Sequence, residues 1–396
     1  PDQPDVANDL AAHLIETHDF DAARAVLETV LGAHPEHRRS LQNMAVIEDW
    51  AGRSDRFLDL HRRMVAAEPA DAATHQALGT ALLSRGRLSE GWAEYRWRFR
   101  NQAHRGWHRG IGLPLLADAP LRGRHLLVWS DQGLGEQILL AGLLAEAERQ
   151  CARLVFACEP RLFSLLRRTL PGVGLAPITE LHTGKVDLSG LEAQASISEI
   201  GPLLRPDLAA FPRHGGYLKP DPARVAALRA RYAALPGEGP VIGLSWRSIN
   251  VLAGAEKSIG LAAWGAILAR APARFVSLQY GDTAADLADA RRRFGLEIFS
   301  DAGIDPVADL DGFAAQVAAV DLVISTSNTT VHMAGAMGVP TLCLTPRVEG
   351  RPWCWIVGTA TSPWYPSVRH VWQSARGRWD DALAHAAALA RGVQSV

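Results

Sequence analysis

The sequence is short of cysteine, of net charge and of long apolar runs, and each shortage excludes a class of protein. Its 4 cysteines fall in separate predicted elements without a close cysteine or histidine partner, so we expect neither a disulfide framework nor a zinc site. A formal net charge of −1 offers no footprint for nucleic acid, and no nucleic-acid partner is expected. No run approaches the roughly 18 apolar residues of a transmembrane helix, so we expect no membrane span and a cytoplasmic protein.

What the chain does have is length and apolar side chains. Its 396 residues are 48% hydrophobic and 21% charged, which is enough to bury more than one core. Length alone predicts about two to three domains.

The first hundred residues repeat. Pro35 and Pro69 stand 34 positions apart, as do Gly52 and Gly86, and His18 lies one period upstream of Gly52. This is the tetratricopeptide period, in which each unit is a pair of amphipathic helices. We predict units at about 5–35, 37–69 and 71–103, and an all-α array over residues 1–104. Stacked helix pairs leave a concave surface suited to a peptide or protein partner; a plain stabilising or dimerising cap is the alternative.

His104, Trp107 and His108 follow the predicted array. Two histidines at this spacing on a helix can in principle clamp a metal ion, but no carboxylate accompanies them. We interpret the segment as a polar linker and predict no metal site.

From about residue 105 onward, short β-rich runs alternate with helical runs, which is typical of βαβ units and parallel sheets. A Pro/Gly-rich bridge at 201–222 divides this region, so we predict α/β domains at 105–219 and 220–396. The expected strands are 126–130, 154–158, 241–246, 274–279, 321–325 and 341–344. The expected helices are 136–150, 160–170, 261–270, 284–294, 312–320, 329–337 and 379–391.

Small polar residues gather where strand 321–325 meets helix 329–337. A helix N-terminus has unpaired N–H groups and partial positive charge, which makes it a ready anion site. Ser327 or Asn328 can cap this helix, and Thr329 and Thr330 add hydroxyl donors. An ordinary N-cap without a ligand is the alternative.

Two further junctions carry candidate ligand groups. In "SDQGLGEQI", Gly133 and Gly135 let a backbone approach a ligand closely, and Glu136 follows in the first turn of a helix. The segment is neither a P-loop nor a full dinucleotide fingerprint. After strand 241–246 come the cations Arg247 and Lys257, and their convergence with a helix N-terminus favours a phosphate or diphosphate ester.

Two other patterns have structural interpretations. Asp309–Asp311 matches the metal-binding pattern DxD, but we interpret it as an acidic turn at a helix entry. Arg351, Trp353, Trp355, Trp364 and Tyr365 form an aromatic cluster in a chain with 12 tryptophans. Core and interlobe packing is expected for this cluster; stacking on a base or sugar is the alternative.

Taken in order, the motifs "SDQGLGEQILLAGLL", "IGLSWRS", "EKSIGLAAWGAIL", "DLDGFAAQVAAVDLVISTSNTTVHMAGAMGVPTLCL" and "SPWYPSVRHVW" resemble a known family. It comprises bacterial proteins that join tetratricopeptide repeats to a heptosyltransferase-like glycosyltransferase. Within it the chain is most similar to alphaproteobacterial flagellin glycosyltransferases, and more distantly to protein O-GlcNAc transferases. The resemblance implies a GT-B fold, with two facing Rossmann-like domains behind the repeat array and a last helix that crosses back to the first domain.

The resemblance also implies roles for residues. Glu136 stands where heptosyltransferases carry an aspartate proposed as general base, and Lys257 matches the family's basic residue. Asn328, Thr329 and His332 match its Asp-Thr-x-x-x-His element, with Asn in place of Asp; this change removes a repulsion toward a donor phosphate or sugar carboxylate. A packing role is the alternative for His332. The full expected donor-binding set is Gly133, Gly135, Arg247, Lys257, Asn328, Thr329, Thr330 and His332.

The implied activity is an inverting, metal-independent glycosyl transfer. The co-substrate would be a nucleotide sugar, such as CMP-linked pseudaminic acid, and the acceptor a Ser or Thr of a protein such as flagellin, selected by the repeats. One alternative is an enzyme that uses UDP-GlcNAc, as O-GlcNAc transferases do. Others are a non-catalytic repeat adaptor with a degenerate transferase half, and an enzyme acting on lipid-linked saccharide.

Overall fold

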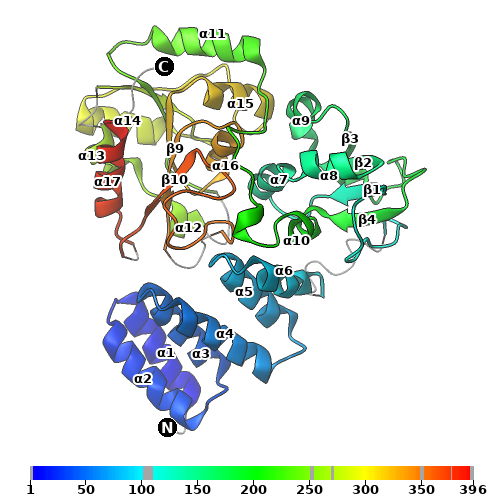
Figure 1. The fold of residues 1–396 in the computed structure, drawn as a ribbon. Coiled ribbons are helices and arrows are strands. Elements are labelled where there is room, and N and C mark those ends of the chain that lie inside the picture. The colour runs from blue at the N-terminus through cyan, green and yellow to red at the C-terminus, as the bar shows by residue number, and fades with distance from the viewer. Residues whose placement is uncertain are drawn as a thin grey trace. The chain divides into compact units, whose positions relative to one another are not determined.

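The computed structural model describes residues 3–100, 110–249, 254–268, 272–347, 352–375 and 377–392 (Figure 1). By their contacts the residues form two units. The helical unit spans Pro1–Trp107 and Pro352–Val357, and the two-lobed unit spans His108–Arg351 and Gly358–Val396. The predicted linker around His104 and His108, and Arg351 of the predicted aromatic cluster, lie outside the described residues.

The helices of the helical unit pack in consecutive pairs, α1 with α2, α3 with α4 and α5 with α6 (Figure 1). Apolar residues at helical spacing form the inner faces, and Leu27 and Leu41 are fully buried there. The carboxylates of Asp19 and Asp71 cap α2 and α5. The bounds are α1 Pro4–Glu16, α2 Phe20–Ala33, α3 Arg38–Trp50, α4 Ser54–Ala67, α5 Ala72–Leu83, α6 Leu88–Tyr95 and the 3₁₀ helix η1 Arg96–Arg100.

The 34-residue spacing recurs in the backbone. His18, Gly52 and Gly86 have φ values of 65°, 72° and 74°, and each stands in the turn between the two helices of a pair. This left-handed conformation is easy for glycine and uncommon for histidine, so the turn keeps its shape even where the residue changes. The sequence period is therefore a period of backbone conformation; the tetratricopeptide assignment itself stays a prediction.

The segment Pro352–Val357 belongs to the helical unit by its contacts, although the predicted boundaries assigned it to residues 220–396. The Trp353 ring lies 5.2 Å from that of Trp92 and 5.9 Å from that of Tyr95. The backbone N–H of Val357 donates to the carbonyl of Ser84 at 2.8 Å. Large aromatic area buried against α6 accounts for this association.

The first lobe of the two-lobed unit is built on a parallel sheet with the strand order β3-β2-β1-β4. Apolar side chains bury β1 almost completely, as expected of a central strand with both faces covered. The strands are β1 His125–Trp129, β2 Arg153–Cys158, β3 Gly174–Pro177 and β4 Ala193–Ser196. The helices are α7 Leu134–Ala141, α8 Leu144–Gln150, α9 Phe163–Thr169 and α10 Gly201–Leu204, with 3₁₀ turns η2 Pro160–Leu162, η3 Ile178–Glu180, η4 Ile197–Glu199 and η5 Leu208–Ala210.

The second lobe has a parallel sheet with the order β10-β9-β8-β5-β6-β7. Trp246 and Trp264 are among the fully buried side chains of its core. The strands are β5 Val241–Ser245, β6 Arg274–Ser277, β7 Ile298–Phe299, β8 Leu322–Thr326, β9 Thr341–Thr345 and β10 Val368–Trp372. The helices are α11 Pro222–Ala233, α12 Gly254–Lys257, α13 Gly265–Leu268, α14 Ala284–Phe294, α15 Leu310–Ala318, α16 Thr329–Ala336 and α17 Asp380–Ala390, with the 3₁₀ helix η6 Leu261–Trp264. The prediction of parallel α/β architecture is confirmed.

The helix expected at 136–150 is interrupted. α7 ends at Ala141 and α8 begins at Leu144. A Cβ atom at Gly142 would lie 2.8 Å from the Tyr217 ring, and the Tyr217 hydroxyl donates to the carbonyls of Ile138 and Leu139. Tyr217 thus occupies the place of the next helical turn and satisfies the carbonyls that this turn would have used.

The last helix corrects an expectation. α17 packs against α13 and against strands β9 and β10, and its residues Leu383 and Ala386 belong to the core of the second lobe. It does not contribute to the first lobe in the way the predicted crossing required. Its Ala-rich apolar face, which suits close packing on a sheet, is covered within its own lobe.

The 4 cysteines are free thiols, and burial raises the pKa of Cys343 to about 12. Among the described residues, no group of three or more His, Cys, Asp or Glu side chains is arranged to hold a metal ion. Within the same part of the chain, no helix has both the length and the apolar character needed to cross a bilayer.

Candidate functional site

Each sheet of the two-lobed unit has one point at which its strand order reverses. In the first lobe the chain runs from β1 out to β2 and β3 and returns on the other side of β1 as β4; in the second it runs from β5 to β6 and β7 and returns beside β5 as β8. Parallel sheets of this kind bind ligands outside the carboxyl ends of the strands at such a point. The predicted site residues lie there: Gly133, Gly135 and Glu136 after β1, Arg247 and Lys257 after β5, and Asn328, Thr329, Thr330 and His332 after β8.

The polar side chains at the β8–α16 junction are bonded to one another. The Asn328 amide donates to the Ser245 hydroxyl at 2.8 Å and to the Arg247 carbonyl at 3.1 Å. Its oxygen accepts from the Thr330 N–H at 2.9 Å and from the Ser325 hydroxyl at 3.1 Å. Asn328 therefore caps α16 and ties the ends of β5 and β8 together.

The three residues of the predicted donor loop differ in exposure. Asn328 and Thr330 are buried, and the Thr330 hydroxyl lies 3.4 Å from that of Ser245. Thr329 is half-buried, and no hydrogen bond of its hydroxyl is recorded among the described residues. Thr329 is thus the member of the trio whose side chain is open to a ligand.

The two predicted cations have different surroundings. The Arg247 guanidinium pairs with Asp286 at 3.0 Å and donates to the carbonyl of Asp282, so it is held toward α14. Lys257 ends α12, and its charge acts on the buried ring of His332. Lys257 thus contributes positive charge on the side of the second lobe that carries α16.

His332 lies at the contact between the two lobes. Burial, with the charge of Lys257, lowers the pKa of His332 to about 3, so its imidazole is neutral at physiological pH. A Cβ atom at Gly135 would lie 2.8 Å from His332 Cδ2. Gly135 thus allows α7 of the first lobe to pack directly on α16 of the second, and packing alone accounts for this glycine.

A chain of tyrosines extends from His332 to α7. The Tyr365 hydroxyl lies 3.2 Å from His332 Nδ1, and the Tyr365 ring lies 6.5 Å from that of Tyr217. The Tyr217 hydroxyl donates to the carbonyls of Ile138 at 2.5 Å and Leu139 at 3.2 Å. Burial raises the pKa of Tyr217, so its hydroxyl keeps its proton. The helix that carries Glu136 therefore packs on His332 of the second lobe at its start and is bonded to Tyr217 of the bridge near its end.

Glu136 is the exception in this well-bonded region. It lies in the first turn of α7 and is half-buried, and its carboxylate has no hydrogen bond or ion pair among the described residues. One carboxylate oxygen lies 3.2 Å from the place that a Cβ atom on Gly133 would take. An unbonded carboxylate beside a helix N-terminus is available to accept a proton from a ligand.

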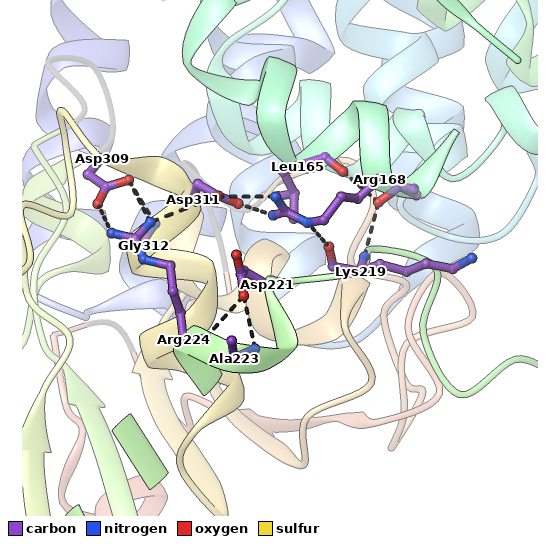
Figure 2. Close-up of polar contacts among 10 residues, drawn as sticks. Leu165, Arg168, Lys219, Asp221, Ala223, Arg224, Asp309, Asp311 and Gly312 are labelled. Carbon is purple, nitrogen blue, oxygen red and sulfur yellow. Dashed lines mark hydrogen bonds and ion pairs between the residues drawn. The ribbon is translucent and has the colours of Figure 1, made fainter. Parts of the chain in front are cut away.

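A second contact between the lobes joins α9 to α15 (Figure 2). The Arg168 guanidinium of α9 forms a bidentate pair with Asp311 of α15, with one N···O distance of 3.3 Å, and Arg168 Nε donates to the Lys219 carbonyl at 3.1 Å. The Asp309 carboxylate caps α15 through the Gly312 N–H at 2.8 Å.

Arginines occupy both carboxylates of the predicted acidic turn. Arg224 pairs with Asp309 at 2.8 Å, while Asp311 pairs with Arg168 (Figure 2). Burial alone would raise the pKa of Asp309, but the Arg224 partner holds it below its ordinary value. The interpretation of Asp309–Asp311 as a helix entry is confirmed.

The described residues of the predicted aromatic cluster are buried, but they belong to different units. Trp353 and Trp355 lie in the segment of the helical unit, and Trp364 and Tyr365 lie in the two-lobed unit. The Trp364 ring lies 4.8 Å from that of Phe211, edge to face, in the bridge between the lobes.

Two groups at this site were not singled out from the sequence. Asp131 follows β1 and accepts a hydrogen bond from the Ser198 hydroxyl at 2.9 Å. Its place directly before "QGLGE" is a signal that could have drawn attention to it. Tyr217 lies in the bridge, and nothing in its sequence surroundings indicates that it reaches α7.

The fold and this site define a class: a protein in which paired helices accompany two parallel α/β lobes whose strand ends converge. The chain is 34% identical over 455 residues to Protein FlbA of Caulobacter vibrioides, an alignment that covers 99% of this chain and 73% of FlbA. The chain belongs to the FlbA family, which confirms at the family level the resemblance that the motifs indicated. No protein-family model matches the chain.

Solved structures show weak likeness. A glycosyl transferase family 9 protein from Veillonella parvula has a TM-score of 0.43 at 12% identity, over 68% of this chain and 92% of that one. The E. coli ADP-heptose heptosyltransferase II has a TM-score of 0.44 at 11% identity, over 63% and 90%. An O-GlcNAc transferase mutant from Thermobaculum terrenum has a TM-score of 0.31 at 14% identity, over 98% and 90%. These likenesses are too weak to identify an activity.

Proposed function

We propose that this protein is an inverting glycosyltransferase of the GT-B type. It would transfer a sugar from a nucleotide sugar to a serine or threonine hydroxyl of a protein acceptor. The observation that carries the proposal is the Glu136 carboxylate, which is without a partner among the described residues and begins the helix that packs on α16. The motif resemblance adds a nonulosonic acid such as pseudaminic acid as the sugar, and flagellin, selected by the helical unit, as the acceptor.

In the proposed reaction Glu136 is the general base. It removes the proton from the acceptor hydroxyl as the oxygen attacks the anomeric carbon, while the bond from that carbon to the nucleotide phosphate breaks. Attack opposite the leaving group inverts the anomeric centre. General-base catalysis of this kind contributes about 10²–10⁴-fold to the rate.

The second lobe would hold the donor. Lys257, the N-terminus of α16 and the Thr329 hydroxyl would receive the departing phosphate, with Arg247 held nearby by Asp286. Asn328 and Thr330 would act indirectly, since they fix the position of this helix end. Cations and a helix dipole supply the positive charge that a divalent metal supplies elsewhere, so a chelator should leave transfer unchanged.

The test is a calorimetric screen of the full chain with CMP-, UDP-, ADP- and GDP-linked sugars, followed by a transfer assay with the donor that binds. Binding of a cytidine nucleotide would support the nonulosonate donor, and binding of a uridine nucleotide an enzyme that uses UDP-GlcNAc. Lys257→Ala should weaken binding of that donor. If no nucleotide sugar binds, the proposed reaction is wrong.

One observation favours a second function, that of a non-catalytic adaptor. The Asn328 side chain, which stands in place of the family's aspartate, is fully used in bonds within the protein. A protein that had lost transfer while keeping its scaffold would show such a closed junction. Donor hydrolysis or sugar transfer by the purified chain would exclude this function.

A further inference from the structure

Two grooves on the helical unit are related by the repeat period. The first, of about 400 Å³, lies between α2 and α4 above α3, and the second, of about 380 Å³, lies between α4 and α6 above α5. Every residue that lines the second groove stands 34 positions after a residue that lines the first; Leu78, for example, corresponds to Met44. The two grooves can therefore be compared position by position.

Their rims differ in one important way. In the second groove Arg62 of α4 and Glu90 of α6 form an ion pair at 3.4 Å, which spans the groove. The corresponding positions of the first groove hold Glu28 of α2 and Arg56 of α4, with the charges exchanged. Both side chains are exposed, and neither has a hydrogen bond or ion pair among the described residues. The first groove is thus open, with a carboxylate on one rim and a guanidinium on the other.

Gly32 leaves the wall of the first groove open. The helical glycines Gly79 and Gly91 are explained by packing, because a Cβ atom there would lie 2.4 Å from Tyr95 N and 2.8 Å from Leu83 Cγ. At Gly32 no atom lies within 4 Å of such a Cβ atom. Glycine is a poor helix former, and Ala66 fills the corresponding position of the second groove. Packing within the chain therefore does not account for Gly32, and a backbone can approach α2 closely at this point.

The floor of the first groove is apolar except for the carboxylate of Glu48, which is ion-paired within the chain. Met44 and Leu60 are buried there, beside Glu48. Burial alone would raise the pKa of Glu48, but hydrogen bonds from Arg53 and Arg24 hold it below its ordinary value. Glu48 is thus an ion-paired carboxylate whose two oxygens are occupied by arginines of this chain.

We propose that the groove between α2 and α4 binds a segment of another protein. The segment's backbone would pass close to Gly32 and one apolar side chain would cover Met44 and Leu60. A basic residue of the segment would face Glu28 and an acidic residue would face Arg56. The presence of both signs of charge selects a polypeptide of mixed charge over nucleic acid or a lipid headgroup, which present one sign. This inference rests on the proposed function, in which the helical unit selects a protein acceptor, but its test measures peptide affinity and needs no sugar transfer.

The test uses the full chain and three synthetic peptides in which a leucine is flanked by one lysine and one glutamate, by two lysines, or by two glutamates. Fluorescence anisotropy should give the mixed peptide an affinity about tenfold or more above that of either uniform peptide. Each uniform peptide places a like charge at one rim whichever way its chain runs, so the chain direction of the bound peptide cannot produce this preference.

Gly32→Met, which fills the groove without an internal clash, should lower the affinity for the mixed peptide about tenfold or more. Its counterpart Ala66→Met in the second groove should not.

Equal binding of the three peptides, or no binding at millimolar concentration, would overturn the proposal. If Gly32→Met fails to fold, the double variant Glu28→Gln, Arg56→Gln takes its place. This variant should lose the preference for the mixed peptide, and a retained preference would overturn the proposal. Sedimentation of the wild-type chain completes the test. If the chain associates with itself and Gly32→Met separates it, the occupant is a second copy and the proposal is wrong.

Discussion

The two strand-to-helix junctions that face each other in the two-lobed unit are opposite in their bonding. At the β8–α16 junction, Asn328 uses its amide nitrogen and oxygen in bonds to strand ends and helix backbone. At the β1–α7 junction, the Glu136 carboxylate has no partner among the described residues. Polar residues after a buried strand therefore do not identify a ligand site by themselves. The indication is a polar group that has no hydrogen-bond partner within the protein.

The largest expected stability effect tests the closed side of this comparison. Asn328→Ala removes the cap of α16 and leaves buried groups at Ser245 and Arg247 without their donor, so the free energy of unfolding should fall by about 2–4 kcal/mol. Chemical denaturation measures it. Asn328→Asp keeps the capping oxygen and should lose less. Unchanged stability in Asn328→Ala would mean that the side chain is available to a ligand. The two junctions would then not differ in their bonding.

The next effect concerns the contact that brings the junctions together. Gly135→Ala places a Cβ atom 2.8 Å from His332 Cδ2, so α7 must move from α16, at a cost of about 1–3 kcal/mol in the free energy of unfolding. Gly133→Ala is the matched control, because its nearest atom is an oxygen of the Glu136 side chain, which can swing aside. Equal losses in the two variants would show that the α7–α16 contact is not the constraint.

A pH effect, expressed per pH unit, tests whether that contact is sealed from water. The pKa of His332 is lowered to about 3, so between pH 6.5 and 3 the unfolded chain takes up a proton that the folded chain refuses. Stability should therefore fall as pH falls through this window, by up to ~1.4 kcal/mol per pH unit from this residue. His332→Asn should flatten the slope of unfolding free energy against pH. An unaltered slope would mean that water reaches the ring.

The smallest effect concerns the contact in Figure 2. Arg168→Ala removes the partly exposed pair with Asp311 and should lower the free energy of unfolding by only about 0.5–1 kcal/mol, and by less at high salt. Arg168→Lys, which keeps the charge but not the bidentate geometry, should recover part of the loss. A loss as large as that of Gly135→Ala would show that the α9–α15 contact, and not the α7–α16 contact, is the main link between the lobes.

The sequence predicted several elements with a strong local pattern, but it missed α11 and β10, whose patterns were also present. It also missed strands that are defined by their neighbours. α14 was predicted at its observed bounds, and β5 and β8 within a residue or so. β3 and β4, with the sequences GLAP and AQAS, were missed because small residues have little strand propensity, and pairing with β2 and β1 makes them strands. Local pattern carries no information about such pairing.

The sequence located the strand ends that carry the candidate residues, but not the bonds that these residues make. The strand ends that bear Glu136 and Asn328 could be located from the βαβ pattern, because parallel strands end on one side of a sheet. The partner of the Asn328 amide, Ser245, lies 83 residues earlier in the chain. A bond across that separation depends on the register of β5 against β8, which the sequence pattern leaves undefined.

The central claim is that an unbonded carboxylate of one lobe deprotonates the acceptor hydroxyl, which attacks a donor held by the other lobe. It is tested most directly by Glu136→Gln. Donor affinity should be unchanged while the transfer rate falls about 10²–10⁴-fold. Asp131→Asn, which alters the neighbouring carboxylate bonded to Ser198, is the control and should lose far less. Full transfer by Glu136→Gln with the donor still bound would contradict the account.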